Sequence, residues 1–172
     1  LLLSRYGRHR KPTNAVDEAG THDVVLRLRD HHRRLKSATS LDALGGHEGA
    51  GSAAYFSVWR HWLGARWAFG ARQQQTGADP INALLDLGYT LLHQSVAGLI
   101  QARGLNPWLG HLHALKAGHM ALASDVMEEF RAMCVDAVVL NLCLNGGLSP
   151  ADFVHRDGAY TLRPDATRQF IR

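Results

Sequence analysis

Two long apolar segments, residues 80–103 and 121–144, constrain what this chain can fold into more than any other feature. The first opens with Asp79, a favoured N-cap residue, and Pro80, which suits the first helical position. Gly104 follows it where a C-terminal glycine cap belongs. Because apolar residues lie on most sides of the first segment, we expect two long, largely buried helices at the centre of the fold.

The rest of the chain predicts shorter helices and almost no strand. We expect helices over 22–36, from Glu48 onward and from Pro164 onward, and at most a small hairpin at the Asp157-Gly158 turn. Polar, glycine-rich stretches predict connections at residues 7–22, 38–47, 64–78 and 105–120. The prediction is a mostly α fold, one domain over residues 1–172, with a basic N-terminal arm over about 1–36.

Basic residues are concentrated at the N-terminal end. Residues 1–36 hold nine Lys and Arg against four acids, a net charge of +5, whereas the remaining residues hold ten against eleven, a net charge of −1. A basic arm on a nearly neutral body favours a polyanionic partner such as nucleic acid. The alternative is a solvated helix face without a partner.

The two cysteines argue against a disulfide-stapled fold. Cys134 and Cys143 lie nine residues apart in one apolar segment, too far along a helix to be bridged, so we expect buried thiols in a reducing, cytoplasmic setting. No apolar run is long enough to span a membrane, and no signal peptide is visible. The chain begins with Leu1 rather than Met, so we expect the natural N-terminus to lie upstream.

Glu48 is the first candidate for chemistry. It follows two glycines and precedes Gly49, Ala50 and Gly51, small residues that would let a ligand approach the backbone. The alternative is a glutamate in a first helical turn that favours the helix dipole. Taken alone, the position favours the alternative.

Further candidates flank the start of the second long helix. His111 and His113 precede it, and either could be a ligand, a DNA contact or a surface residue. Asp125 lies near its start and shares a helix face with Glu128 and Glu129. Helix capping is the alternative interpretation of Asp125.

Together these side chains predict a divalent metal site. Carboxylates with one imidazole suit Mg²⁺ or Mn²⁺, whereas the tight His/Cys cluster typical of Zn²⁺ is missing from the sequence. Such an ion, bound to a phosphate, can polarise the phosphoryl oxygen and help to deprotonate a water or a 3′-hydroxyl.

Four ordered blocks then resemble the CRISPR-associated integrase/endonuclease family (Cas protein one). They read GHEGAGSAAYF over 46–56, DPINALL over 79–85, GLNPWLGHLH over 104–113 and ALASDVMEEFR over 121–131. Asp152-Phe153 and Tyr160-x-Leu162 follow in the family's order, so the resemblance spans the chain.

The resemblance implies a fold, a site and partners. It implies that Glu48, His113 and Asp125 are metal ligands, and its register chooses His113 over His111. It implies Mg²⁺ or Mn²⁺ as cofactor, double-stranded and branched DNA as substrate, a homodimer, and Cas protein two as partner. The reaction would be phosphodiester cleavage and attack by a 3′-hydroxyl that inserts spacer DNA into a CRISPR array.

The sequence departs from the family in several places. Set beside the family, the sequence leads us to expect that the N-terminal β-rich domain is missing, which would affect dimer formation and partner binding. Glu129 and Ala132 replace usual prolines, and Ser124 stands where an aliphatic residue is common.

Five basic residues are candidates for contacts to DNA phosphates, which position a duplex without specifying its sequence. They are Arg72, Arg60, Arg66, Lys116 and Arg131. Arg131 has an alternative, an ion pair with Glu128 in its own helix. Two other functions stay open: a transposon (casposon-type) integrase that shares this domain, and an inactive helical DNA-binding fragment.

Overall fold

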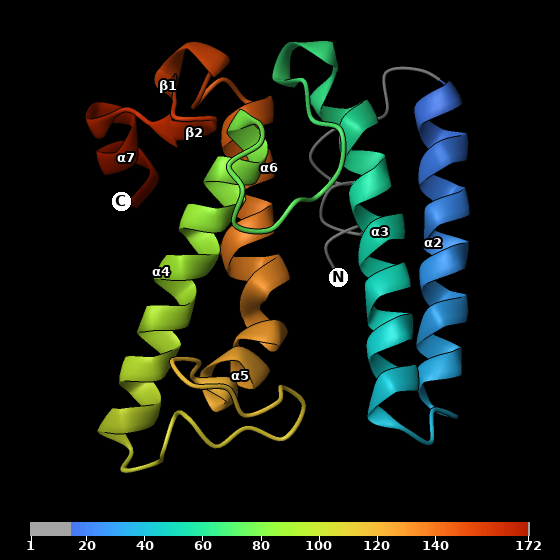
Figure 1. Cartoon of the computed structure of the whole chain (residues 1–172). Coiled ribbons are helices and arrows are strands. Elements are labelled where there is room, and N and C mark those ends of the chain that lie inside the picture. The colour runs from blue at the N-terminus through green and yellow to red at the C-terminus, as the bar shows by residue number, and fades with distance from the viewer. Residues whose placement is uncertain (1–14, 172) are drawn as a thin grey trace. The chain divides into compact units, whose positions relative to one another are not determined.

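The computed structural model describes residues 15–171 and confirms the mostly α fold, with one two-stranded sheet in that range (Figure 1). The chain divides into two compact units, Leu1–Gln73 and Gln74–Arg172. The part of the predicted basic arm at residues 1–14 lies outside the described residues, and the assignment of one domain over 1–172 stays a prediction.

The first unit is built on two packed helices, α2 (Ala15–Leu35) and α3 (Leu41–Leu63). The indole N–H of Trp62 on α3 donates to the hydroxyl of Thr21 on α2 at 3.4 Å. Rings of the α3 residues Phe56 and Trp59 pack at 5.1 Å between centroids, and the following short helix η1 (Ala65–Trp67) leads to Phe69, whose ring contacts both. These aromatic side chains bury enough apolar surface to pack α3, although its sequence has no continuous stripe of aliphatic residues.

Both helices of this unit begin earlier than the sequence predicts. The prediction of a turn over residues 38–47 is wrong, because α3 begins at Leu41. Ser40 is the N-cap, and its hydroxyl accepts a hydrogen bond from the Ala43 N–H at 3.1 Å. Gly45 and Gly46 weaken helical propensity, but the cap and the packed aromatic end outweigh that cost. Likewise α2 begins at Ala15, inside the predicted connector 7–22.

The second unit is centred on α4 (Pro80–Ala102), which confirms the prediction for 80–103. The Asp79 carboxylate caps it by accepting from the Asn82 N–H at 2.8 Å and from the Asn82 amide at 2.7 Å. Gly104 follows the helix with a φ of 71°, a left-handed conformation that glycine adopts at little cost.

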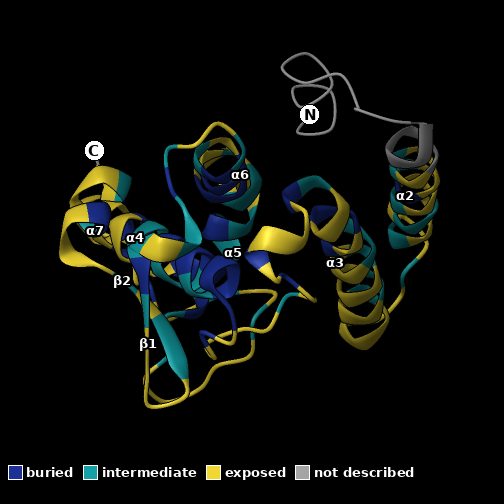
Figure 2. Cartoon of the chain, turned by 90° about the horizontal axis from the view of Figure 1, so that it is seen from above, coloured by how far each residue is buried: buried dark blue, intermediate teal, exposed yellow. Residues whose placement is uncertain are grey.

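The second long segment is not one helix. It forms α5 (Ala121–Arg131), a π-helical turn η2 (Ala132–Asp136) and α6 (Ala137–Leu144). All three pack against α4, and Figure 2 shows buried stretches on α4, α5 and α6. The buried α4 residues Val96, Ala97 and Ile100 cluster with Ala123 of α5 in the core.

The π-helical turn sets which side chains of this segment are buried. Asp136 is buried and accepts a hydrogen bond of 2.5 Å from the Tyr89 hydroxyl on α4. The expectation that both thiols are buried is wrong for Cys134, which is exposed, because Val135 and Asp136 occupy the side of the turn that faces α4. Cys143 on α6 is buried as predicted.

A small hairpin completes the unit. After the short helix η3 (Pro150–Asp152), strands β1 (Phe153–Arg156) and β2 (Ala159–Leu162) pair antiparallel, with Phe153 opposite Leu162. Asp157 and Gly158 both have positive φ, 52° and 81°, as a two-residue type I′ turn requires. Helix α7 (Pro164–Ile171) follows.

Among the described residues, none of the helices combines the length and the apolar character that crossing a membrane requires.

We expect Gly88→Ala to destabilise the protein by about 1–3 kcal/mol, because a Cβ there would lie 2.6 Å from Val135 Cγ1 and 3.3 Å from Phe170 Cζ. Gly98→Ala on the same helix is the matched control, since nothing lies within 4 Å of its Cβ. It should stabilise by about 0.5–1 kcal/mol. Urea unfolding measures both, and equal effects of the two substitutions would refute this account of α4 packing.

Candidate functional site

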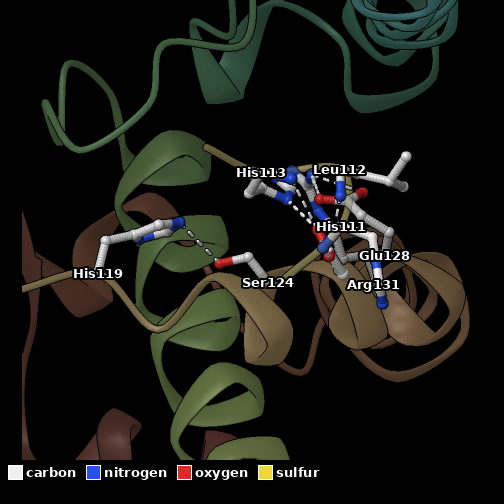
Figure 3. Close-up of polar contacts among 8 residues, drawn as sticks. His111, Leu112, His113, His119, Ser124, Glu128 and Arg131 are labelled. Carbon is white, nitrogen blue, oxygen red and sulfur yellow. Dashed lines mark hydrogen bonds and ion pairs between the residues drawn. The ribbon is translucent and has the colours of Figure 1, made fainter. Parts of the chain in front are cut away.

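His113 and Asp125 meet where the connection between α4 and α5, residues 103–120, returns to α5. One carboxylate oxygen of Asp125, Oδ2, accepts from the backbone N–H groups of His111 at 2.5 Å and Leu112 at 3.0 Å. The other, Oδ1, accepts from the His113 N–H at 2.9 Å and lies 2.7 Å from its Nδ1. Figure 3 shows His111, Leu112 and His113 gathered around this point. The carboxylate therefore holds the loop and the imidazole together.

Gly110 allows the loop to come this close to α5. A Cβ at Gly110 would lie 2.7 Å from Asp125 Oδ2 and 2.8 Å from the Cβ of Ala121. Earlier in the loop, the Pro107 carbonyl accepts from the Leu122 N–H at 2.9 Å, which fixes the loop to the first turn of α5. Any side chain larger than hydrogen at position 110 would push the loop away from the carboxylate.

The electrostatics of the pair fix its protonation. Burial acts to raise the pKa of Asp125, but the hydrogen bonds from the His113 side chain and from the backbone of His111, His113 and Leu112 outweigh it and hold the pKa well below its usual range. An ionised carboxylate can only accept, so the His113 Nδ1 must carry the proton. In the neutral imidazole, Nε2 then carries the lone pair, which is the atom that can bind a metal.

Glu48 lies on α3 in the first unit, whereas His113 and Asp125 belong to the second unit. It is exposed and stands seven residues after Leu41, where α3 begins. The helix-dipole explanation therefore does not apply to Glu48, because that effect is confined to the first turn, where Asp42 lies. The structure brings two of the three predicted ligands, His113 and Asp125, into contact.

Within residues 15–171, no group of three or more His, Cys, Asp or Glu side chains lies close enough together to hold a metal ion. The set predicted from the sequence, with Glu48 in one unit and the other two residues in the second, stays a prediction. Its chemistry nonetheless fits a hard divalent ion, since it combines carboxylate oxygens with one imidazole whose Nε2 has a lone pair.

His119 lies near His113 and His93 lies near His119, and no sequence motif indicated either histidine. The ring centroid of His119 lies 5.8 Å from that of His113 and 6.3 Å from that of His93 on α4. Ser124, the departure from the family's aliphatic residue, is buried, and its hydroxyl is hydrogen-bonded to His119 Nε2 at 3.3 Å (Figure 3). The serine and the histidine thus satisfy each other. Their separation of five residues gave no sequence signal for the contact.

The Arg131 guanidinium, a candidate for DNA contact, is engaged inside the protein. Its Nη1 donates to both carboxylate oxygens of Glu128, at 2.7 and 2.9 Å, and the group lies over the ring of Tyr89 at 4.4 Å. This confirms the alternative interpretation, the ion pair within its own helix.

The other four basic candidates lie at the surface or partly buried. Arg60 and Lys116 are exposed, Arg66 stacks on the Trp67 ring at 5.6 Å, and Arg72 donates to the Gln73 carbonyl at 2.7 Å. Their contact with DNA stays a prediction.

Comparison with known proteins identifies the family of this chain. The model of the family described as CRISPR associated protein Cas1 matches residues 1–172, which confirms the resemblance carried by the four sequence blocks. A relative from Thermus thermophilus, CRISPR-associated endonuclease Cas1 1, is 40% identical over 99% of this chain.

Solved structures show the same fold. A partial Cas6-RT-Cas1–Cas2 complex superposes on 98% of this chain with a TM-score of 0.86 and 27% identity, covering 51% of that chain. A casposase bound to integration product superposes on 90% with a TM-score of 0.77 and 25% identity, covering 46% of that chain. This chain spans about half the length or less of the curated relatives, and 50% of the Thermus thermophilus endonuclease Cas1 1.

We expect Asp125→Asn to lower the free energy of unfolding by about 2 kcal/mol at neutral pH, because hydrogen bonds to a charged acceptor are lost. The folded-state pKa of Asp125 lies below its ordinary value of 3.8. The stabilisation of the folded state by ionised Asp125 is therefore complete above pH 3.8 and is lost as the pH falls through the lower folded-state pKa. The difference between wild type and variant should shrink in acid, as measured by urea unfolding across the acid range.

Glu129→Gln, an exposed carboxylate on the same helix, is the control and should change stability by less than about 0.5 kcal/mol. A difference for Asp125→Asn that stays constant from neutral pH into strong acid would contradict the assignment of the low pKa.

Proposed function

This chain belongs to the CRISPR-associated Cas1 family, and on that premise we propose that it is a metal-dependent DNA endonuclease and integrase of CRISPR adaptation. The observation that carries the proposal is the contact between Asp125 and His113, which leaves an oriented imidazole Nε2 on a loop fixed to α5. An imidazole held in this way by a carboxylate is a recurring arrangement at metal centres.

We propose Glu48, His113 and Asp125 as the ligands of Mg²⁺ or Mn²⁺. A divalent ion at this position would polarise the phosphoryl oxygen of a bound phosphodiester and stabilise the leaving oxygen. His113 would supply Nε2, and Glu48 on α3 and Asp125 on α5 would supply carboxylate oxygens. Charged Arg72, Arg60, Arg66 and Lys116 side chains would position the DNA backbone.

The proposed reaction conserves the number of phosphodiester bonds. A 3′-hydroxyl at the end of a DNA fragment would form a new bond to phosphorus and lose its proton to solvent, while the bond from phosphorus to the departing 3′-oxygen breaks and that oxygen takes up a proton from solvent. Hydrolysis is the same displacement with water as the nucleophile. The substrate would be double-stranded or branched DNA, and the product would be a CRISPR array with an inserted spacer.

We propose a homodimer with Cas2 as partner, and a partial Cas6-RT-Cas1–Cas2 complex that superposes on 98% of this chain supports the choice of partner. A casposase also shares the fold, so a transposon integrase is the second candidate. Both candidates use the same chemistry, and a CRISPR array beside the gene would separate them.

We expect His113→Ala to reduce Mn²⁺-dependent cleavage and strand transfer on branched DNA by at least about 100-fold, because the metal loses a ligand. His111→Ala is the matched control: it keeps the backbone N–H that Asp125 binds and should retain activity. A gel assay with labelled DNA, with and without EDTA, measures this. Equal activity of the wild type with EDTA would refute metal dependence.

We expect Glu48→Gln to abolish the same activity while leaving stability unchanged, since Glu48 is exposed on α3. Asp42→Asn removes another exposed acid of that helix and should keep full activity, at a cost of about 0.5 kcal/mol in helix-dipole stabilisation. Cleavage rates and thermal unfolding of both variants check this, and an active Glu48→Gln would exclude Glu48 from the metal site.

A further inference from the structure

The helical segment that runs from α5 into α6 holds one residue more than an uninterrupted α-helix would, and this extra residue lies in η2. The N–H of Ala137 donates to the carbonyl of Ala132, five residues back, where an α-helix would pair residues four apart. A single extra residue turns all the following side chains by about 100° around the helix axis. Its position along the segment therefore decides which side chains face α4.

Tyr89 on α4 contacts both ends of this turn. The guanidinium of Arg131, the last residue of α5, lies over the Tyr89 ring at 4.4 Å from its centroid. The Tyr89 hydroxyl donates to Oδ1 of Asp136, the last residue of η2, at 2.5 Å. Tyr89 and Asp136 are both buried, so exchanging this hydrogen bond for one to water is costly.

One side chain can contact both Arg131 and Asp136 only because of the extra residue. In an uninterrupted α-helix, residues five apart lie about 140° apart around the axis. Because the π-helical turn takes up one residue, Arg131 and Asp136 have the relation of residues four apart, about 40°. Without the turn, Val135 would be in phase with Arg131 and would place an aliphatic side chain against the Tyr89 hydroxyl.

We propose that Tyr89, Arg131 and Asp136 form a register lock, which holds the extra residue between Ala132 and Asp136. The cation–π contact fixes the α5 side of the turn, and the hydrogen bond to the buried carboxylate fixes the α6 side. A shift of the extra residue toward either helix would take Arg131 or Asp136 away from Tyr89. The register lock thereby sets how α5 is turned against α4, and it does not depend on the proposed chemistry.

The close approach of the turn to α4 favours the same register. The buried Val135 side chain lies against Gly88, where a Cβ would come to 2.6 Å from Val135 Cγ1. Gly88 and Tyr89 are neighbours on α4, just as Val135 and Asp136 are neighbours in the turn. The valine fits the space that the glycine leaves, and the aspartate meets the hydroxyl. A shift by one residue would disturb both contacts.

Two single-residue deletions test the register lock, because both allow a continuous α-helix but place Asp136 differently. They remove Cys134 or Val138, which are both exposed. Deletion of Cys134 leaves Arg131 and Asp136 four residues apart, so both side chains still face Tyr89. Deletion of Val138 leaves them five apart and turns Asp136 away from the hydroxyl by about 100°.

We expect the chain without Cys134 to unfold at the wild-type Tm or above it, since ordinary α-helical hydrogen bonds replace those of the rare π turn. The chain without Val138 should lose about 4 °C or more in Tm, because the hydroxyl and the carboxylate lose each other. Thermal unfolding followed by circular dichroism measures both. A chain without Cys134 that is no more stable than the chain without Val138 would overturn the proposal.

Tyr89→Phe tests the hydroxyl without changing the length of the helix. It keeps the ring under Arg131 and removes only the donor to Asp136. We expect hydrogen–deuterium exchange of the full chain, read by NMR, to become about tenfold faster at the amides of residues 134–137, because the turn opens more readily. Exchange of the α4 amides should stay unchanged, which separates local opening of the turn from a general loss of stability.

Thr90→Val is the matched control for this measurement. It removes the neighbouring hydroxyl on α4, which donates to the Asp86 carbonyl of the same helix at 2.7 Å. We expect it to leave exchange in the turn at the wild-type rate. An unchanged rate in Tyr89→Phe, or an equal acceleration by Thr90→Val, would overturn the register lock, and this comparison decides even where a deletion prevents folding.

Discussion

Burial of one face of α4 against α5, η2 and α6 is the interaction on which the second unit depends. Fully buried Ile81, Leu84 and Leu85 lie in the first turns of α4, and Gly88 gives Val135 room to approach. Because α4 and α5 pack side by side, the connection between them leads back to the start of α5. There its residues 111–113 come into contact with Asp125. The candidate site is therefore a product of helix packing as much as of its own residues.

Much of the fold could be predicted because its signals are local. Asp79, Pro80 and Gly104 mark the ends of α4, and Asp157-Gly158 marks the hairpin turn. The start of α3 could not, because Gly45 and Gly46 suggest a turn, and the capping by Ser40 prevails only with the tertiary packing of the aromatic end. The exposure of the Cys134 side chain could not be predicted either, because it follows from the π-helical turn.

The candidate site, too, could be predicted only in part. Four motif blocks single out His113 and Asp125, and their contact agrees with that pairing. The hydrogen bonds from three successive backbone N–H groups could not be predicted, because they depend on loop dihedral angles that no residue type specifies. The contact of His119 with Ser124 is likewise a result of folding, visible only once the loop is closed.

The π-helical turn at Ala132–Asp136 has a consequence for how the chain is aligned with its relatives. A π turn holds one more residue than an α turn, and each extra residue rotates the following side chains by about 100° about the axis. The buried positions of α6 are therefore offset by one residue along the sequence from a continuation of the α5 pattern, although both helices pack against α4. A relative that lacks this extra residue would place the same apolar positions one residue earlier, so a gap belongs within the turn, beside the pairing of Tyr89 with Asp136.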